Sequence, residues 1–225
     1  MSIERCVLMF VKSPDAGLVK TRLSRDIDEK AVLSLYRNFG IDLLETLRRG
    51  KYTFKIIFTP PEAEDKISAW LGKDCSYEPQ RGNDLGERMK NAFSNAFLEG
   101  FTRVLLIGSD IPDLPDMILH EAFELDSHDA VIGPAFDGGY YLIGFKNNTF
   151  LPEIFAEISW STDAVFARTM EIFNMSRYKV NILPKWRDVD SIEDLHALAD
   201  RNRYTDFAGS NTMDFIAKNR SSLFR

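Results

Sequence analysis

The sequence predicts an α/β protein with a doubly wound, mostly parallel sheet that has helices on both of its faces. Short apolar runs typical of buried strands alternate with longer segments whose apolar residues recur at helical spacing. Polar loops rich in aspartate follow several of these runs, at the predicted carboxyl ends of strands, where open α/β sheets bind their ligands. No repeat or Pro/Ser-rich linker divides the 225 residues, so we expect a single domain over residues 1–225.

The predicted elements follow one another as strand and helix along most of the chain. We expect strands at 6–11, 54–58, 104–107, 130–132, 141–145 and 179–183, and helices at 32–47, 62–71, 85–96, 117–125 and 165–173. A capping box at 191–194 opens a further helix, and Ser161-Thr162 is a candidate cap for the helix at 165–173. The strand at 141–145 should be antiparallel to its predecessor, because only a tight glycine turn separates the two.

The end of the chain carries a weaker pattern. Residues 206–225 are expected to form a helix docked outside the sheet through Met213, Phe215 and Ile216. A dimerisation arm is the alternative, so an oligomer stays possible.

Composition excludes several classes of partner. The net charge of −6 argues against a general binder of nucleic acids or of anionic membranes. No apolar stretch approaches the roughly 18 residues of a membrane span, and the N-terminus does not have the pattern of a signal peptide. Cys6 lies in a predicted strand and Cys75 near a turn, which favours free thiols over a disulfide. We therefore expect a cytoplasmic protein.

The loop after the first predicted strand, residues 12–23, is shaped by Pro and Gly and carries several cations. Lys12, Lys20, Arg22 and Arg25 could bind a polyphosphate through charge and through the forked geometry of arginine. The loop has neither the Gly-Lys-Ser/Thr ending of a P-loop nor the G-x-G-x-x-G of a dinucleotide site. The alternative is a solvated basic loop without a ligand.

Two aspartates flank Ile111-Pro112 directly after the strand at 104–107. Pro112 should fix Asp110 at the strand end, and carboxylates suit Mg²⁺, which fills its remaining positions with substrate phosphates. We favour a metal ligand at Asp110 over an Asx-turn. Asp113 is instead interpreted as the cap of the following helix.

Two more acidic segments could face the same cleft. Alternate residues of an extended segment point the same way, so the carboxylates of Asp188 and Asp190 could both face the ligand. The alternative for Asp190 is a residue that neighbours a helix N-cap and has no other role. The turn Asp137-Gly138-Gly139-Tyr140 permits a ligand close to its backbone, and a plain hairpin turn is the competing interpretation.

Six motifs, taken together and in order, resemble a bacterial family. They are Lys12-x-Pro14-x-x-Gly17-x-x-Lys20-Thr21-Arg22-Leu23, Gln80-x-Gly82-x-x-Leu85-Gly86-x-Arg88-Met89, Gly108-Ser109-Asp110-x-Pro112-Asp113-Leu114, Gly133-Pro134-Ala135-x-Asp137-Gly138-Gly139-Tyr140-Tyr141-Leu142-Ile143-Gly144, Trp160-Ser161-Thr162 and Asp188-Val189-Asp190. This set is similar to the GT-A-like family DUF2064, also described as radical-SAM/selenodomain-associated transferase 1, over residues 5–200. The family resembles nucleotide-diphospho-sugar transferases.

The resemblance implies a role for each motif. Mg²⁺ or Mn²⁺ would bind to Asp110 and to Asp190 or Asp188. A nucleotide would contact residues of three motifs, namely Lys12, Gly17, Lys20, Arg22, Gln80, Gly82 and Ser109. The second substrate, a small acceptor, would lie against Asp137, Gly138, Gly139, Tyr140 and Trp160, with Asp137 and Lys20 as candidate catalytic residues.

The expected reaction is a metal-dependent transfer from a nucleotide-activated donor, an NDP-sugar, to a small acceptor. In either transfer chemistry, a divalent ion and cationic side chains neutralise a diphosphate. One alternative is a nucleotidyltransferase that uses an NTP and a phosphorylated acceptor. The other is a nucleotide-binding regulator without turnover. The sequence has Ser109-Asp110-Ile111-Pro112 where glycosyltransferases have Asp-x-Asp, and it also lacks the Gly-rich first loop of classical nucleotidyltransferases.

Overall fold

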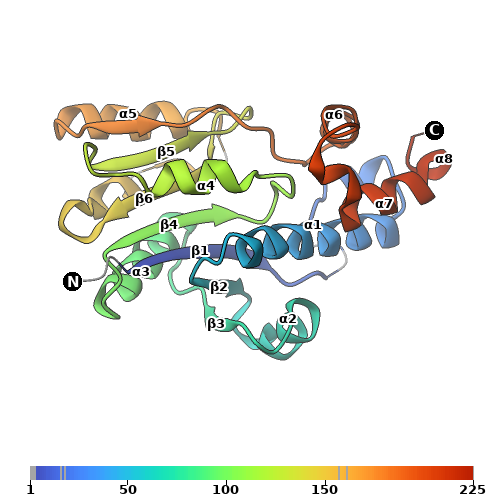
Figure 1. Cartoon of the computed structure of the whole chain (residues 1–225), viewed down its shortest axis with the longest axis horizontal. Helices are drawn as coiled ribbons and strands as arrows, with labels where there is room; N and C mark the ends of the chain where they lie inside the picture. The colour runs from blue at the N-terminus through green and yellow to red at the C-terminus, as the bar shows by residue number, and fades with distance from the viewer. Residues whose placement is uncertain (1–3, 16, 18, 157, 161, 225) are drawn as a thin grey trace.

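One seven-stranded sheet organises the protein (Figure 1). The computed structural model describes residues 4–15, 17, 19–156, 158–160 and 162–224. The strands are β1 (Arg5–Lys12), β2 (Phe54–Thr59), β3 (Ser76–Pro79), β4 (Arg103–Gly108), β5 (Ala130–Pro134), β6 (Tyr140–Lys146) and β7 (Val180–Ile182), in the spatial order β3-β2-β1-β4-β6-β5-β7. All neighbouring pairs are parallel except those of β6, which is antiparallel to both β4 and β5. The predicted doubly wound fold and the antiparallel strand are confirmed.

Helices cover both faces of the sheet, as predicted. They are α1 (Glu29–Arg49), α2 (Glu64–Leu71), α3 (Leu85–Leu98), α4 (Asp116–Phe123), α5 (Val165–Met175), α6 (Ile192–Arg201), α7 (Asn211–Lys218) and α8 (Arg220–Leu223). Figure 1 shows α1 and α4 in front of the sheet and α6, α7 and α8 grouped at one end of the molecule. No helix within the described ranges is long and apolar enough to cross a lipid bilayer.

Alternate side chains of β1 pack into two separate hydrophobic cores, one on each face of the sheet. Val7, Met9 and Val11 pack with α1, α2 and α4 on one face, whereas Cys6 and Leu8 join Phe10 and helices α3 and α5 on the other. A sheet that is apolar on both faces is what a parallel arrangement with helices on each side requires. The central strands are therefore rigid supports for the loops at their ends.

A third core joins the two ends of the chain. Leu35 and Phe39 of α1 pack with Leu195 of α6 and Ile216 of α7. Asp42, buried in α1, accepts hydrogen bonds from the backbone N–H groups of Asn211 (2.9 Å) and Thr212 (2.8 Å), so α1 caps the start of α7. Residues 206–224 are thus divided between a 3-10 turn (Asp206–Gly209), α7 and α8, and α7 and α8 pack against α1 and α6 through the third core.

Three local predictions are wrong, each for a physical reason. The segment Ser76–Pro79, which is not among the strands expected from the sequence, is the edge strand β3, because its short polar sequence gives no apolar run. Helix α4 starts after Pro115, so Asp113 is not its cap. Thr162 does not cap α5, because its hydroxyl donates to the Ser159 carbonyl and Ala164 precedes the helix; Ser161 lies outside the described residues.

Candidate active site

The central feature of the site is a buried lysine between two aspartates from distant loops. The Lys20 ammonium lies 2.6 Å from Oδ1 of Asp110 and 2.8 Å from Oδ1 of Asp190. Only 2% of the lysine side chain is exposed, whereas the Asp110 carboxylate is 45% exposed. An ammonium buried to this degree requires paired anions to offset its lost hydration. The two carboxylates supply them, and Asp110 keeps an open side.

The loop after β1 turns Lys20 inward. Lys20 has φ +51°, in the left-handed region that side chains other than glycine rarely adopt. Such a conformation costs roughly 1–3 kcal/mol and persists where the surroundings impose it. Here the carbonyl of Lys20 accepts from Ser24 N–H at the start of a 3-10 turn, and its ammonium is 5.9 Å from the centre of the Phe39 ring. The loop is therefore built around this inward lysine.

Backbone contacts hold the 188–190 segment beside the end of β4. The Val189 N–H donates to the Asp110 carbonyl at 2.9 Å. Val189 is fully buried in the third core, so its neighbours Asp188 and Asp190 point away from that core. Alternation thus places both aspartates on the same side, as the sequence predicts.

The ion pairs set the protonation of Lys20 and Asp190. Burial alone would lower the pKa of Lys20, but the charges of Asp110 and Asp190 and their hydrogen bonds raise it above its ordinary value. Burial would raise the pKa of Asp190, yet Lys20 and, more weakly, Arg22 hold it below its ordinary value. Both groups are charged at neutral pH, and the charge of Arg22 is felt at Asp190.

Asp188 differs from Asp190 in that its pKa is raised. Burial raises the pKa of Asp188 to about 7, and the charges of Asp137 and Asp190 add to that rise, while Lys20 opposes it. The charge of the Asp137 carboxylate therefore acts on Asp188. Asp110, Asp137, Asp188, Asp190 and Lys20, from four loops at one edge of the sheet, are hereafter called the acidic cluster.

Asp137 has a local contact as well. Its Oδ1 accepts from the Gly139 N–H at 2.9 Å, the hydrogen bond expected of a simple turn. Gly138, at φ +92°, allows the backbone of Asp163 to approach so closely that a Cβ would lie 2.2 Å from its carbonyl oxygen. Gly138 thus serves packing against the segment before α5, while the Asp137 carboxylate also acts on Asp188.

The donor chemistry of the acidic cluster fits a hard cation. Carboxylate oxygens of Asp110 and Asp190 already share one cation, the Lys20 ammonium, at ion-pair distance. In the part of the chain that the structure describes, no three His, Cys, Asp or Glu side chains are arranged to hold a metal together. The Lys20 ammonium occupies the space between the two aspartates, and the binding of Mg²⁺ or Mn²⁺ by Asp110, Asp190 or Asp188 stays a prediction.

The other residues expected to bind phosphate lie around this centre. Lys12 is exposed at the last position of β1, Arg22 is exposed on the loop that follows, and Gly17 has φ +73°. Ser109 is buried, and its hydroxyl lies 3.2 Å from the Tyr36 hydroxyl, which also binds the backbone of Lys12. Tyr36 thus ties the ends of β1 and β4 together. The phosphate contacts themselves stay predictions.

The motif at 80–82 lies at the end of β3. The buried amide nitrogen of Gln80 donates to the carbonyls of Ile57 (3.0 Å) and Val11 (3.4 Å), which joins three strand ends. Gly82, at φ +141°, lies against α3, where a Cβ would come within 2.8 Å of the Arg88 nitrogen. Both residues therefore have structural duties, and their contact with a nucleotide stays a prediction.

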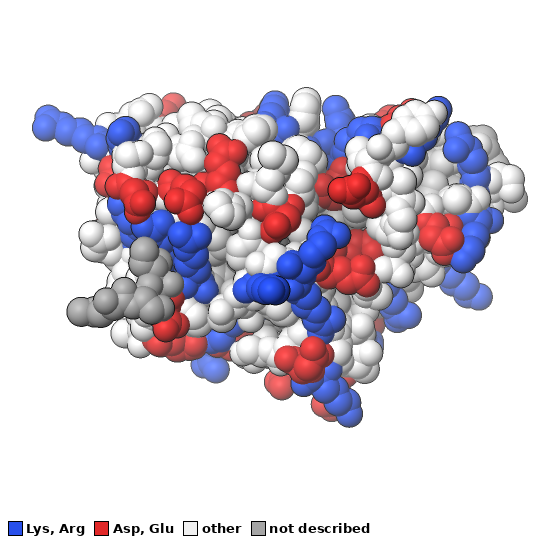
Figure 2. Space-filling model, viewed as in Figure 1, with Lys and Arg blue, Asp and Glu red and all other residues white. Residues whose placement is uncertain are grey.

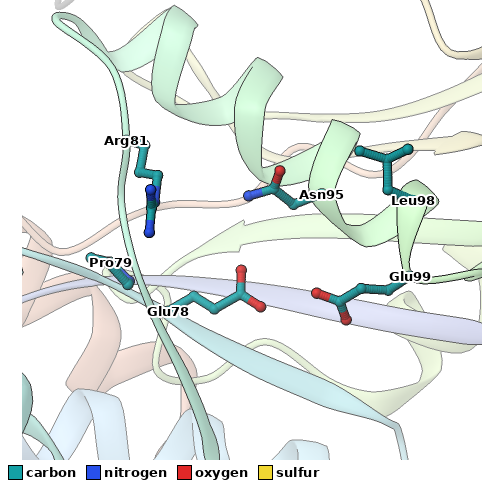
Figure 3. Close-up of a pocket in the computed structure, with 6 residues that line it drawn as sticks. All are labelled: Glu78, Pro79, Arg81, Asn95, Leu98 and Glu99. Carbon is teal, nitrogen blue, oxygen red and sulfur yellow. The ribbon is translucent and has the colours of Figure 1, made fainter.

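A hollow of about 400 Å³ lies beside this segment, between β3 and α3 (Figure 3). It is lined by Glu78, Pro79, Arg81, Asn95, Leu98 and Glu99. Figure 3 shows the carboxylates of Glu78 and Glu99 pointing toward one another across it. Lys55 forms ion pairs with both, at 2.5 Å to Glu99, so one ammonium offsets part of the negative charge of the two carboxylates.

Tyr140 and Trp160, expected near the acceptor, lie in the core around α3. Their rings pack edge to face with centroids 6.4 Å apart, and the Tyr140 hydroxyl is 3.8 Å from the Met89 sulfur. Burial raises the pKa of Tyr140 above its ordinary value. The Trp160 ring also packs against the backbone of Gly86, where a Cβ would lie 2.7 Å from the indole nitrogen. These aromatics form a wall next to the Asp137 turn.

Sequence reasoning missed a buried polar network under the site. Asp113 accepts from Arg201 at 2.7 Å, from Asn202 at 2.6 Å and from the Trp186 indole at 3.1 Å. It therefore ties the loop after β4 to α6 and to the segment before Asp188, in place of the predicted helix cap. The Asp-x-Pro-Asp spacing shows two acids near a strand end but does not reveal which one turns inward.

Charges on the surface are mixed. Figure 2 shows carboxylates and cations interspersed over the visible face rather than gathered by sign. This face therefore has no broad basic field of the kind that binds polyanions.

A family model described as "Uncharacterized protein conserved in bacteria (DUF2064)" matches residues 43–162 of the chain. A crystal structure of a protein provisionally classed as a nucleotide-diphospho-sugar transferase, from Desulfovibrio desulfuricans G20, is 42% identical. That match covers 99% of this chain and 97% of the other, with a TM-score of 0.95. The chain belongs to the DUF2064 family. The expected family resemblance is confirmed.

More distant structures share the fold with this DUF2064 protein. A cytidylyltransferase from Leptospira borgpetersenii is 16% identical, with coverage of 99% and 97% and a TM-score of 0.59. A Mycobacterium tuberculosis protein solved in complex with manganese is 15% identical, with coverage of 89% and 100% and a TM-score of 0.53. No curated protein sequence matches the chain. At these identities the likeness shows the nucleotide-diphospho-sugar transferase fold alone.

Proposed function

We propose that this transferase uses Mg²⁺ or Mn²⁺, takes an NDP-sugar as donor and transfers the sugar to a small acceptor. The observation that carries the proposal is the Lys20 ammonium shared by Asp110 and Asp190 at an open edge of the sheet. Carboxylates that share one cation at a strand end suit the shared coordination of a divalent ion and a diphosphate. The acidic cluster is the proposed reaction centre.

Each side chain has a defined task in this proposal. Asp110 and Asp190, with Asp188 as the alternative to Asp190, would hold the divalent ion, which stabilises the negative charge of the diphosphate leaving group. Lys20 and Arg22, on the loop after β1, would bind the phosphate oxygens of the donor, assisted by Lys12. Positioning and charge stabilisation supply most of the acceleration.

Asp137 is proposed to face the acceptor. Its carboxylate lies near Asp188 but makes no ion pair with a lysine or arginine in the described ranges. It can therefore accept a hydrogen bond from an acceptor hydroxyl and take its proton as the new bond forms. The turn glycines Gly138 and Gly139 and the wall of Tyr140 and Trp160 would bound that substrate.

A nucleotidyl transfer is the second candidate, and the cations of the loop after β1 favour it. Lys12, Lys20 and Arg22 gather three cationic side chains within eleven residues, a richness that suits the longer polyphosphate of an NTP. In that reaction a phosphorylated acceptor attacks the α-phosphorus, and no protein base is needed.

One experiment separates these reactions. The protein is incubated with NDP-sugars or with NTPs, with and without Mn²⁺, in the presence of pooled small acceptors. Metal-dependent release of nucleoside diphosphate supports glycosyl transfer, whereas release of pyrophosphate identifies nucleotidyl transfer. Nucleotide binding without either product, at every donor, would show a regulator and overturn the proposal.

The Asp110→Ala variant tests the metal site. It should lose Mn²⁺-dependent nucleotide binding while its circular dichroism stays unchanged. Asp200→Ala, which removes an exposed carboxylate of α6, is the matched control and should bind as the wild type does. Unchanged metal-dependent binding by Asp110→Ala would contradict the assignment.

A further inference from the structure

An exposed aromatic ring with two cations adjoins the acidic cluster. The Phe136 side chain is 51% exposed, and both the Lys185 ammonium and the Arg187 guanidinium lie 4.7 Å from its ring centre. Cations at this distance from an aromatic ring are attracted to its face. Phe136, Lys185 and Arg187 are hereafter called the cationic patch.

The backbone fixes the cationic patch next to the acidic cluster. The Phe136 N–H donates to the Trp186 carbonyl at 3.2 Å, and the Trp186 N–H donates to the Pro134 carbonyl at 3.0 Å. These bonds continue the sheet between the two loops, with Ala135 paired to Trp186. Phe136 directly precedes Asp137 and Arg187 directly precedes Asp188. Phe136 and Arg187 are thus next to residues of the acidic cluster in the sequence, and Lys185 is three residues from Asp188.

The segment that carries the cations is held on several sides. The Tyr141 hydroxyl donates to the Pro184 carbonyl at 3.0 Å, and Arg201 donates to the Arg187 carbonyl at 3.0 Å. The Arg187 guanidinium donates to Asp194 at 3.0 Å. A cation on a fixed backbone loses little freedom when it binds a ligand, which favours affinity.

The charge of the cationic patch is only partly neutralised. Arg187 uses one of its five N–H donors on Asp194, and Lys185 forms no ion pair with any carboxylate in the described part of the chain. The neighbouring carboxylates of the acidic cluster would repel a second anion unless cations offset them. A neutral acceptor would need only the hydrogen bond from its hydroxyl to Asp137 and no cation. Two cations there instead match an acceptor that carries a negative charge.

We propose that the cationic patch binds an oxyanion group, a phosphate or a carboxylate, of the acceptor while its hydroxyl faces Asp137. Lys185 contributes an ammonium and Arg187 a forked pair of N–H donors, while the Phe136 ring covers the adjoining apolar part of the ligand. The acceptor class is therefore an anionic hydroxylated small molecule. This inference rests on the proposed transferase function, because only a transferase needs a second substrate at Asp137.

The test uses the full-length protein labelled with nitrogen-15 and free of nucleotide and metal. Inorganic phosphate and acetate are titrated in separate arms, and the backbone amide resonances of Phe136 and Arg187 are followed. Saturable shifts at these amides are expected with at least one of the two anions, and the arm that saturates at lower concentration identifies the oxyanion class.

Variants make the test specific. Lys185→Glu should weaken the fitted affinity by at least about tenfold, because a charge-assisted contact is replaced by repulsion. Lys73→Glu changes an exposed lysine after α2 in the same way and should leave the affinity unchanged. Lys185→Ala, which adds no repulsion, should give an intermediate loss. Arg187 is left intact because its partner Asp194 also belongs to the capping box of α6.

Three results would overturn the inference. They are shifts that do not saturate with either anion, equal affinity in Lys185→Glu and the wild type, and shifts confined to the loop after β1. Since neither metal nor nucleotide is present, a failure here leaves the donor and metal experiments above unaffected. Conversely, saturable binding at the patch in a protein that transfers nothing would contradict the proposed function alone.

Discussion

The Lys20 ammonium lies 2.8 Å from Oδ1 of Asp190, although 170 residues separate the two along the chain. This contact joins the loop after β1 to the segment before α6 across the edge of the sheet. In the absence of a metal ion, the Lys20 ammonium is thus the counter-ion of the two aspartates of the proposed metal site. A divalent ion must therefore compete with Lys20 for the same oxygens.

Replacing Lys20 with Met should raise the affinity for Mn²⁺ in the absence of nucleotide. Met is of similar length but carries no charge, so the aspartates lose their internal counter-ion. We expect at least about a tenfold gain, because a charge-assisted contact no longer has to be displaced. Titration followed by the electron paramagnetic resonance of free Mn²⁺ measures it. Lys12→Met, at the exposed last residue of β1, is the control and should leave the affinity for Mn²⁺ unchanged. If Lys20→Met binds Mn²⁺ no more tightly than the wild type, the shared site is wrong.

Removing Arg22 should flatten the dependence of binding on phosphate number. In the wild type, affinity should rise from nucleoside to diphosphate and triphosphate, and Arg22→Ala should lose at least about tenfold for the charged ligands. Isothermal titration calorimetry across the series provides the measurement. Arg49→Ala, an exposed arginine at the far end of α1, should keep the wild-type series. A steep series in Arg22→Ala would show that this residue does not contact phosphate.

The Asp137→Asn variant should separate acceptor chemistry from donor binding. Asn keeps the size and the turn hydrogen bond to Gly139 but cannot act as a base. Affinity for nucleotide with Mn²⁺ should stay within about threefold, a difference below about 1 kcal/mol. Turnover with the acceptor found by the assay above should fall sharply. If both parameters are unchanged, Asp137 serves only the turn.

Asp113→Ala should destabilise the protein without any loss of charge at the open site. Removing this buried carboxylate leaves Arg201, Asn202 and the Trp186 indole without their acceptor. The free energy of unfolding should fall by about 3 kcal/mol or more, as measured by urea denaturation. Asp200→Ala, an exposed aspartate of α6, should change it by less than about 1 kcal/mol. Similar stability in both variants would mean that the network contributes little.

The sequence predicts the layers of the fold and the edge of the sheet that carries the site, but it does not predict which side chains pair with one another there. Apolar runs such as 104–107 reveal the buried strands, and aspartates after them reveal the functional edge. The partner of Lys20 could not be inferred, because nothing local to residue 20 points to residue 190. The same holds for Asp113, whose partners lie 73 to 89 residues away. A short polar edge strand such as β3 likewise gives no apolar signal.

The placement of Val189 links the proposed chemistry to the far end of the chain. This residue lies between Asp188 and Asp190 and is buried with Ile216 of α7 and Leu223 of α8. A local opening of α7 and α8 would loosen its packing and release both aspartates together. Ligand binding at the carboxylates should then slow amide hydrogen exchange in helices that the ligand never touches. The C-terminal helices would report occupancy of the site from a distance.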